Sequence, residues 1–225
     1  MGAHRPRPLL TTCVCLGLTL MIVQGPRSSL ARAEAASPTS RRSYRIDRDR
    51  SRVTIETHSS TLLSSSARSH LLRAGDFRGQ VSLVPQMMET TVVDFTVRAD
   101  SLTILDEMSE PSRRDIDLAV RKVLDSARYP RIVFRSTAAS AKPIGPNLYE
   151  VAASGTLELH GVRRPLTVSA QVSVEQDLLR IRGRCTLRQT DYGLVPFSLG
   201  KGAINVADDV TLTFELVATM GPGGE

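Results

Sequence analysis

Residues 179–188 read LRIRGRCTLR, a stretch in which apolar or small residues alternate with polar ones without a break. Successive side chains of a β-strand point to opposite faces, so one face of this segment carries four arginines and the other carries apolar or small side chains. A register shift of one residue would bury those arginines. The stretch therefore predicts a strand with one face in water and the other against an apolar interior.

The same period recurs in three further segments, residues 93–99, 166–174 and 210–218. One-sided strands in an open sheet would leave unpaired edges, and closure of the sheet into a barrel removes those edges. The short connections between segments favour antiparallel neighbours. The sequence therefore predicts an all-β fold, an antiparallel barrel of about eight strands.

One segment, residues 111–126, has a helical period instead. Its apolar residues recur at intervals of three and four, and charged residues occupy the opposite face. Ser109 is placed to cap the N-terminus, with Pro111 in the first turn. We expect a short amphipathic helix whose apolar stripe packs against one end of the barrel. The stripe consists of Ile116, Ala119, Val120, Val123 and Leu124.

The N-terminal residues have the pattern of a secretory signal. Basic residues precede an apolar run from Leu9 to Val23, and Ala31-Arg32-Ala33 is a small-x-small cleavage site. This run of fifteen residues is shorter than the roughly 20 that span a bilayer, which argues against a membrane anchor. We expect a signal peptide over residues 1–33, a flexible spacer over 34–43, the barrel domain over 44–219 and a disordered tail over 220–225.

Removal of residues 1–33 changes the charge and the cysteine content of the chain. The full sequence has a net charge of +6, but the mature chain has 25 basic and 23 acidic side chains. So small an excess argues against a nucleic-acid partner. Cys185 would be the one cysteine left, so the mature chain would have no internal disulfide. Its inward position predicts a buried thiol with a raised pKa.

Catalytic and metal sites lack support in the sequence. The chain has no Gly-x-Ser-x-Gly segment, and His58, His70 and His160 have no recognisable partner motif. These histidines are far apart, and no Cys-x-x-Cys pair accompanies them, so we expect no metal site. Gly200-Lys201-Gly202 lacks the first glycine of a phosphate-binding loop and is better explained as a hairpin turn. We expect a protein that is not an enzyme and has no cofactor.

Small residues on the inward parity bear on whether the barrel is hollow. An eight-stranded barrel is close to the size at which side chains either fill the interior or leave a cavity for one ligand. Small inward residues favour a lumen, and the alternative is a filled core. The small inward residues are Ala99, Ala153, Gly155, Ala170, Gly183, Cys185 and Ala218.

The hydroxyl-rich stretch Ser59–Ser66 has no clear alternation, and we expect a loop or an irregular edge there.

Four segments in order resemble the YceI-like family, over about residues 44–218. They are Tyr44-Arg45-Ile46-Asp47 with Ser51-Arg52-Val53; Val123-Leu124-Asp125 with Tyr129-Pro130-Arg131-Ile132-Val133-Phe134-Arg135-Ser136; Gly155-Thr156-Leu157-Glu158-Leu159-His160-Gly161-Val162; and Gln189-Thr190-Asp191-Tyr192-Gly193. One branch of that family has a Gly-His-Asp-His-like run after the first strand. This chain has Ala67-Arg68-Ser69-His70 at that place and keeps the last histidine alone.

The resemblance implies an exported, lipocalin-like barrel whose apolar tunnel holds a long-chain isoprenoid such as a quinone precursor, or a related lipid or fatty amide. It makes the protein a carrier, periplasmic or secreted. Inward residues would line the tunnel, and His70, Asp191 and Tyr192 would contact the head group or form the rim. The tunnel residues are Phe95, Val97, Phe134, Leu157, Leu159, Val168, Ala170, Ile181, Cys185, Leu187 and Phe214.

Two matters stay open at the level of sequence. The first is a different function, in which an envelope interaction protein or stress-protective protein has a filled barrel and no stable ligand. The second concerns partners: relatives can form homodimers, so a homodimer is an open alternative, and we expect any contact with a membrane to be transient.

Overall fold

The structure is a computed structural model that describes residues 40–61, 64–199 and 204–221, all within one compact unit, residues 36–225. The expected signal peptide, spacer residues 34–39, tail residues 222–225 and the Gly200–Gly202 turn lie outside the described residues. The described strands are β1 (Arg42–Thr61), β2 (Ser64–Ala74), β3 (Phe77–Val84), β4 (Met87–Arg98), β5 (Leu102–Ile104), β6 (Arg131–Gly145), β7 (Leu148–Leu159), β8 (Val162–Val174), β9 (Leu178–Arg188), β10 (Ser198–Leu199) and β11 (Ile204–Met220). The helical elements are α1 (Glu110–Val123) and the 3₁₀ turns η1 (Ala99–Ser101) and η2 (Gln189–Tyr192).

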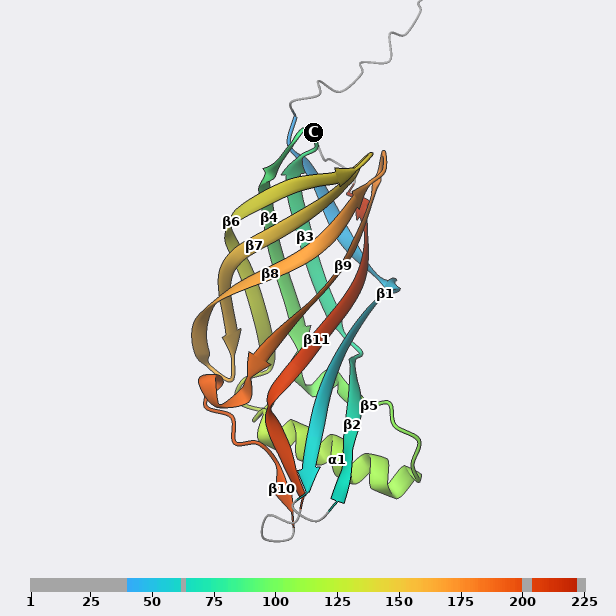
Figure 1. Ribbon diagram of the computed structural model, residues 1–225, viewed down its shortest axis with the longest axis vertical. Helices are drawn as coiled ribbons and strands as arrows, with labels where there is room; N and C mark the ends of the chain where they lie inside the picture. The colour runs from blue at the N-terminus through green and yellow to red at the C-terminus, as the bar shows by residue number, and fades with distance from the viewer. Residues whose placement is uncertain (1–39, 62–63, 200–203, 222–225) are drawn as a thin grey trace, which may run out of the picture. The chain divides into compact units, whose positions relative to one another are not determined.

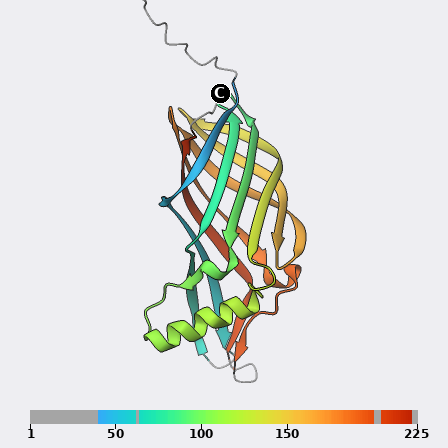
Figure 2. The same ribbon diagram turned by 180° about the vertical axis from the view of Figure 1, so that it is seen from behind.

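Eight of these strands close into a barrel, as the sequence predicts. Their order is β11-β9-β8-β7-β6-β4-β3-β1, and β1 pairs with β11 to complete the ring. Every pairing is antiparallel. Figures 1 and 2 show the strongly tilted strands from opposite sides, with α1 at one end of the barrel.

Strand β1 is long enough to serve two parts of the molecule. Its first residues pair with β3, and its second half, from Thr54 on, pairs with β2. Between them a bulge separates Asp47 from Arg52, and there the Ser51 hydroxyl accepts a hydrogen bond of 2.9 Å from Val217 N on β11. The bend carries β1, with β2 and β5 beside it, past the barrel towards α1 (Figure 1).

The alternation in β9 places its two faces as the sequence predicts. Leu179 and Ile181 are buried, whereas Arg180 and Arg182 are exposed. Glu175 and Glu215 form ion pairs with these two arginines. The inward residues of β9 belong to the apolar core, and its arginines lie on the face exposed to water.

Helix α1 begins one residue before the expected range and ends at Val123. The side chain of Ser109 caps it by accepting a hydrogen bond from Ser112 N, and Val120 and Val123 pack against the core. Asp117 Oδ1 accepts a hydrogen bond of 3.0 Å from Ile104 N on β5. Helix and strand are thereby fastened together, and the helix covers the barrel end as expected. Among the described residues, none of the helices has the length and apolar character needed to traverse a lipid bilayer.

Of the two alternatives expected for Ser59–Ser66, the structure shows the irregular edge and not the loop, because the strand register shifts between Thr57 and Ser59 and again between Ser59 and Thr61. Strand β1 continues to Thr61 and β2 begins at Ser64, and the ladder between them includes the pair His58 and Ser69. The physical reason is that backbone groups make the ladder hydrogen bonds, so a hydroxyl-rich strand can pair without apolar alternation. The connection between β7 and β8 is a two-residue hairpin turn at His160 and Gly161, whose φ values are 52° and 74°.

Candidate functional site

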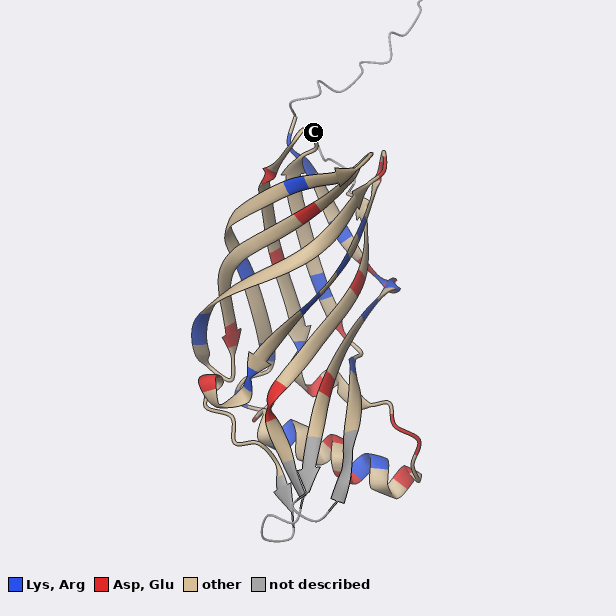
Figure 3. Cartoon of the chain, viewed as in Figure 1, with Lys and Arg blue, Asp and Glu red and all other residues tan. Residues whose placement is uncertain are grey.

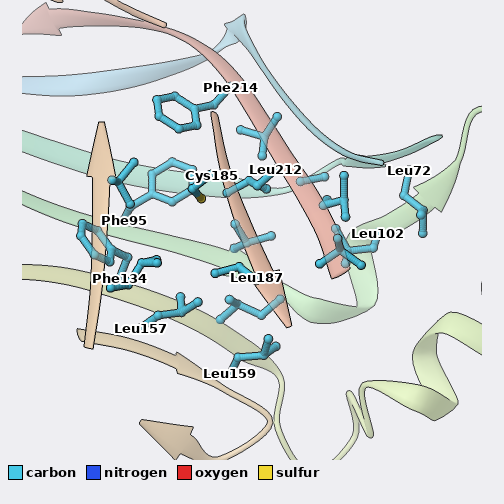
Figure 4. A pocket seen from close by; sticks show the side chains of 18 of the residues that line it. Leu72, Phe95, Leu102, Phe134, Leu157, Leu159, Cys185, Leu187, Leu212 and Phe214 are labelled. Carbon is cyan, nitrogen blue, oxygen red and sulfur yellow. The ribbon is translucent and has the colours of Figure 1, made fainter. Parts of the chain in front are cut away.

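The barrel encloses a cavity of about 790 Å³, which lies between the strands and α1. This volume is within the range of about 300–1,000 Å³ that is typical of small-molecule sites. Figure 4 shows how the labelled side chains, from Phe95 and Phe134 to Leu187 and Phe214, converge on it from different strands. The barrel of this structure is therefore hollow, which disfavours the filled-barrel alternative.

Twelve of the fourteen predicted site residues line this cavity. Eleven of them have the inward parity of their strands, whereas His70 was expected from the resemblance to the family. They are Phe95, Val97, Phe134, Leu157, Leu159, Val168, Ala170, Ile181, Cys185, Leu187, Phe214 and His70.

Asp191 and Tyr192 are not among the residues that line the cavity, and their role as head-group or rim contacts stays a prediction. Tyr192 is 3% exposed within η2, where burial first and the charge of Asp191 second raise the pKa of its phenol. Asp191 is exposed, and its backbone oxygen accepts a hydrogen bond of 3.1 Å from Arg164 Nε. Their turn also accepts a 3.3 Å hydrogen bond from His160 Nδ1 at Tyr192 O. These two hydrogen bonds connect η2 to β8 and to the turn before it.

The small inward residues do not all contribute space. Ala153, Ala170 and Cys185 line the cavity, but Ala99 and Ala218 are 1% and 0% exposed in packed regions. The space beside Gly183 is filled by Phe214, and that beside Gly155 by the Arg135 backbone, so neither glycine opens the lumen. The prediction of a lumen is thus correct, but only some of the small residues on which it was based line that lumen.

Sequence reasoning missed a large part of the wall. Many of these residues belong to strands β1, β2, β5 and β11 or to α1, whose neighbours could not be assigned from pattern alone, and others extend the wall along β3, β4, β6, β7 and β8. The missed apolar residues include Ile55, Leu72, Leu102, Ile104, Ile116, Val120, Val210 and Leu212.

All but six of the lining side chains are apolar, and five of the six polar ones belong to segments at the α1 end. The exception is Thr91 on β4, near the β3–β4 hairpin at the opposite end of the barrel (Figure 1). The other five are Thr57, His70, Asp115, Arg188 and Gln189. The cavity therefore has a long apolar part and a polar end beneath the helix.

Thr57 and His70 form the best-defined part of this polar end. They are partners in the β1–β2 ladder, and both line the cavity. The imidazole Nδ1 of His70 lies 2.6 Å from Asp106 Oδ2, and Asp106 Oδ1 accepts a hydrogen bond of 3.1 Å from Leu71 N. The Thr57 hydroxyl is buried and has no hydrogen-bond partner in the described part of the chain. A bound polar group could pair with that hydroxyl and with the remaining ring nitrogen of His70.

Cys185 lies on the apolar part of the wall. Burial raises the pKa of its thiol to about 11, as its inward position predicts, which keeps it in the neutral form at ordinary pH. Within residues 40–61, 64–199 and 204–221, no three His, Cys, Asp or Glu side chains are grouped so that they could hold a metal ion. The chemistry that this site offers is burial of an apolar chain with polar contacts at one end.

Comparison with known proteins agrees with this architecture. The family model of the YceI-like domain matches residues 44–218. A UPF0312 protein of Pseudomonas syringae pv. tomato is 27% identical over 146 residues, which are 62% of this chain and 69% of that protein.

Solved structures show the same fold at low sequence identity. BcnA of Burkholderia cenocepacia matches with a TM-score of 0.58 and 22% identity, over 77% of this chain and 99% of that one. A polyisoprenoid binding domain of Saccharophagus degradans matches with a TM-score of 0.52 and 15% identity, over 79% and 98%. The YCEI protein of Campylobacter jejuni matches with a TM-score of 0.52 and 15% identity, over 72% and 90%.

Proposed function

The chain belongs to the YceI-like domain family, and on this premise we propose that it is a non-enzymatic carrier that binds a long-chain isoprenoid or a similar lipid in its barrel. The observation that carries the proposal is the apolar cavity of about 790 Å³. The polyisoprenoid binding of the related Saccharophagus degradans domain supports the same ligand class. A quinone precursor or a fatty amide has the required form, an apolar chain with a polar head.

The apolar wall would supply most of the binding free energy. Removal of apolar surface from water contributes roughly 25 cal/mol per Å², or about 0.8 kcal/mol for each buried methylene group. A chain that reaches from the α1 end towards Thr91 would contact Phe95, Phe134 and Phe214 on the way. Affinity should therefore grow with chain length until the cavity is filled.

The polar end would orient the ligand. Thr57 and His70 both line the cavity, and the Thr57 hydroxyl has no hydrogen-bond partner among the described residues. A carbonyl or hydroxyl head group bound there could supply that partner. Specificity for the head would come from these few groups, because the apolar wall discriminates by length and shape alone. Entry would occur at the α1 end, where the helix covers the barrel.

Export is part of the proposal. The basic, apolar and small-residue order of residues 1–33 supports a cleaved signal, which would place the mature chain in the periplasm or outside the cell. Determination of the N-terminus of the exported chain tests this part. A mature N-terminus near Glu34 is expected, and a chain that retains residues 1–33 would contradict export by cleavage.

Mass spectrometry tests the carrier function. The exported chain is purified without detergent, and its native mass is compared with the lipids in an organic extract. We expect one long-chain lipid per barrel. A protein that stays unliganded after incubation with quinones and fatty amides would refute the proposal.

A ligand series then tests the tunnel. Loss of each methylene should weaken binding about fourfold, which corresponds to about 0.8 kcal/mol. Ligands with one head group and decreasing chain length provide the comparison. Equal affinity of short and long ligands would mean that the cavity wall does not bind the chain.

A further inference from the structure

A second concave surface lies on the outside of the barrel and has the opposite chemistry. It is a groove of about 360 Å³ on the outward faces of β3, β4, β6, β7 and β8, closed at one side by residues 128–130. Among its lining residues, Glu158 has the one carboxylate, whereas five residues carry guanidinium groups. These arginines, which define the arginine groove, are Arg78, Arg128, Arg131, Arg135 and Arg163.

The strand register explains why a groove forms there. A row of neighbours crosses the barrel from Arg78 on β3 through Thr96, Val133 and Glu158 to Arg163 on β8. The two residues in the middle, Thr96 and Val133, have short side chains. The short side chains of Thr96 and Val133 form the bottom of the groove, and the longer side chains around them form its sides. A small ligand in the groove could therefore contact several guanidinium groups at once.

The charges in the groove are only partly compensated. Glu158 forms an ion pair of 2.8 Å with Arg163, and Asp94 forms one of 3.0 Å with Arg135. In the described part of the chain, Arg78, Arg128 and Arg131 form no ion pair with a carboxylate. Glu158 and Arg163 are partners in the β7–β8 ladder, and Figure 3 shows a basic band near the start of β8 and an acidic band near the end of β7.

Arg128 is held at the groove by an aromatic ring. Its guanidinium carbon lies 5.2 Å from the centre of the Tyr129 ring, within the range of a cation–π contact. The centre of the Tyr129 ring also lies 4.7 Å from the centre of the His160 ring, and the Tyr129 ring packs against Gly161. The guanidinium is thus placed beside the groove without a carboxylate to neutralise it.

The outer face of β9 shows that arginines on this barrel can be arranged differently. Three of the four outward arginines there, Arg180, Arg182 and Arg188, form ion pairs with carboxylates of neighbouring segments. Ordinary solvation of a strand face does not require uncompensated arginines to converge on one concavity. After Glu158 and Asp94 are counted, the groove retains three positive charges.

We propose that the arginine groove binds a phosphate group, either that of a soluble diphosphate or that of an anionic phospholipid head. Guanidinium groups match phosphate oxygens with paired hydrogen bonds, and a phosphate can accept from several of them at once. A single carboxylate has fewer oxygens and less charge for three uncompensated arginines. This site is independent of the lipid in the barrel, because its lining shares no residue with the cavity.

The test is titration of the exported chain with sodium pyrophosphate, followed by cosedimentation with phosphatidylcholine vesicles that contain or lack phosphatidic acid. Both are done at roughly 0.15 M salt, where charges more than about 8 Å apart are largely screened. Arg78→Gln and Arg131→Gln should each weaken binding about fivefold, the effect expected for one exposed ion pair. Arg184→Gln is the matched control, because it removes an exposed arginine of β9 outside the groove.

The outcomes distinguish the sources of the phosphate. Binding of pyrophosphate alone indicates a soluble ligand, and binding of the acidic vesicles alone indicates a lipid head; either supports the site if the groove variants bind more weakly than Arg184→Gln. Glu158→Gln should strengthen binding, because it removes the negative charge in the lining. Absence of binding to both probes, or equal losses in groove and control variants, would overturn the proposal, whatever the lipid content of the barrel.

Discussion

The ring of Phe214 occupies the space beside Gly183, so that a β-carbon added at residue 183 would lie 2.5 Å from Phe214 Cζ and 2.5 Å from Ser169 O. The absence of a β-carbon at this position of β9 thus leaves room for the aromatic ring of Phe214 on β11. Ser169 O belongs to the backbone of β8 and cannot turn away. The relationship identifies residue 183 as a packed position of the barrel, although it has inward parity.

Gly183→Val should therefore destabilise the fold. Overpacking of a well-packed site costs about 1–3 kcal/mol, and here both a ring and a backbone oxygen would have to move. The measurement is the free energy of unfolding in urea. Stability equal to that of the wild type would show that Phe214 can relocate into the cavity without loss.

Ala170→Phe should have the opposite profile, because Ala170 faces the cavity. The added ring would occupy space that the ligand uses, so the lipid recovered per barrel should fall while stability changes by less than about 1 kcal/mol. Extraction and unfolding are measured on the same sample. Ala218→Leu serves as a control, since Ala218 is fully buried outside the cavity and its enlargement should cost stability.

Thr57→Val tests the polar end of the cavity. The variant keeps the shape of the side chain but removes a buried hydroxyl that lacks a partner, so the empty protein should be no less stable. Ligand affinity should fall about fivefold, the equivalent of a hydrogen bond of about 1 kcal/mol. Thr54→Val on the same strand, outside the cavity, should leave affinity unchanged. If Thr57→Val binds the ligand as tightly as the wild type, the Thr57 hydroxyl does not contribute to ligand binding.

Asp117→Ala should loosen α1 over the barrel end. The substitution removes the acceptor for Ile104 N, a bond worth about 1 kcal/mol, and leaves that amide without a partner. Hydrogen exchange of residues 110–123 should become about fivefold faster, and ligand should leave the barrel faster. Arg114→Ala removes an exposed charge from the same helix and serves as the comparison. Unchanged exchange would show that Arg113, which donates to Ile104 O and Asp106 O, suffices.

Cys185 should report on occupancy of the cavity. Because burial raises the pKa of its thiol from 9.0 to about 11, the folded protein at pH 8 has about 100-fold less thiolate than an ordinary cysteine. Labelling by iodoacetamide should be slower by that factor, and slower still with ligand present. The raised pKa also means that the thiol favours folding below pH 9 and that this contribution is lost as pH rises towards 11. Labelling at the rate of a free thiol would contradict the buried placement.

The sequence predicts the barrel well because alternation is a local property. Residues such as Ile181 and Arg182 are assigned to a face by their neighbours in the chain alone, and α1 is recognised by its own period and by the cap at Ser109. The strand count follows, since few other arrangements bury so many one-sided strands.

The site is less predictable because it depends on which strands become neighbours. Gly183 and Ala170 have the same inward parity, and only the position of Phe214 makes one packed and the other open. The polar pair of Thr57 and His70 requires the β1–β2 ladder, in a region where the hydroxyl-rich sequence conceals the strands. The place of Asp191 depends on η2, a short turn that the alternation of the strands does not predict.

The pairing of β1 with β11 also determines at which stage of folding the barrel can close. These two strands are joined by contacts such as that of Ser51 with Val217, which are 166 positions apart in the chain. Contacts of such long range form late and slowly, because most of the chain must be ordered before they gain anything. A chain whose final strand has not yet paired therefore lacks a complete cavity, so the cavity can bind a ligand only after the barrel has closed.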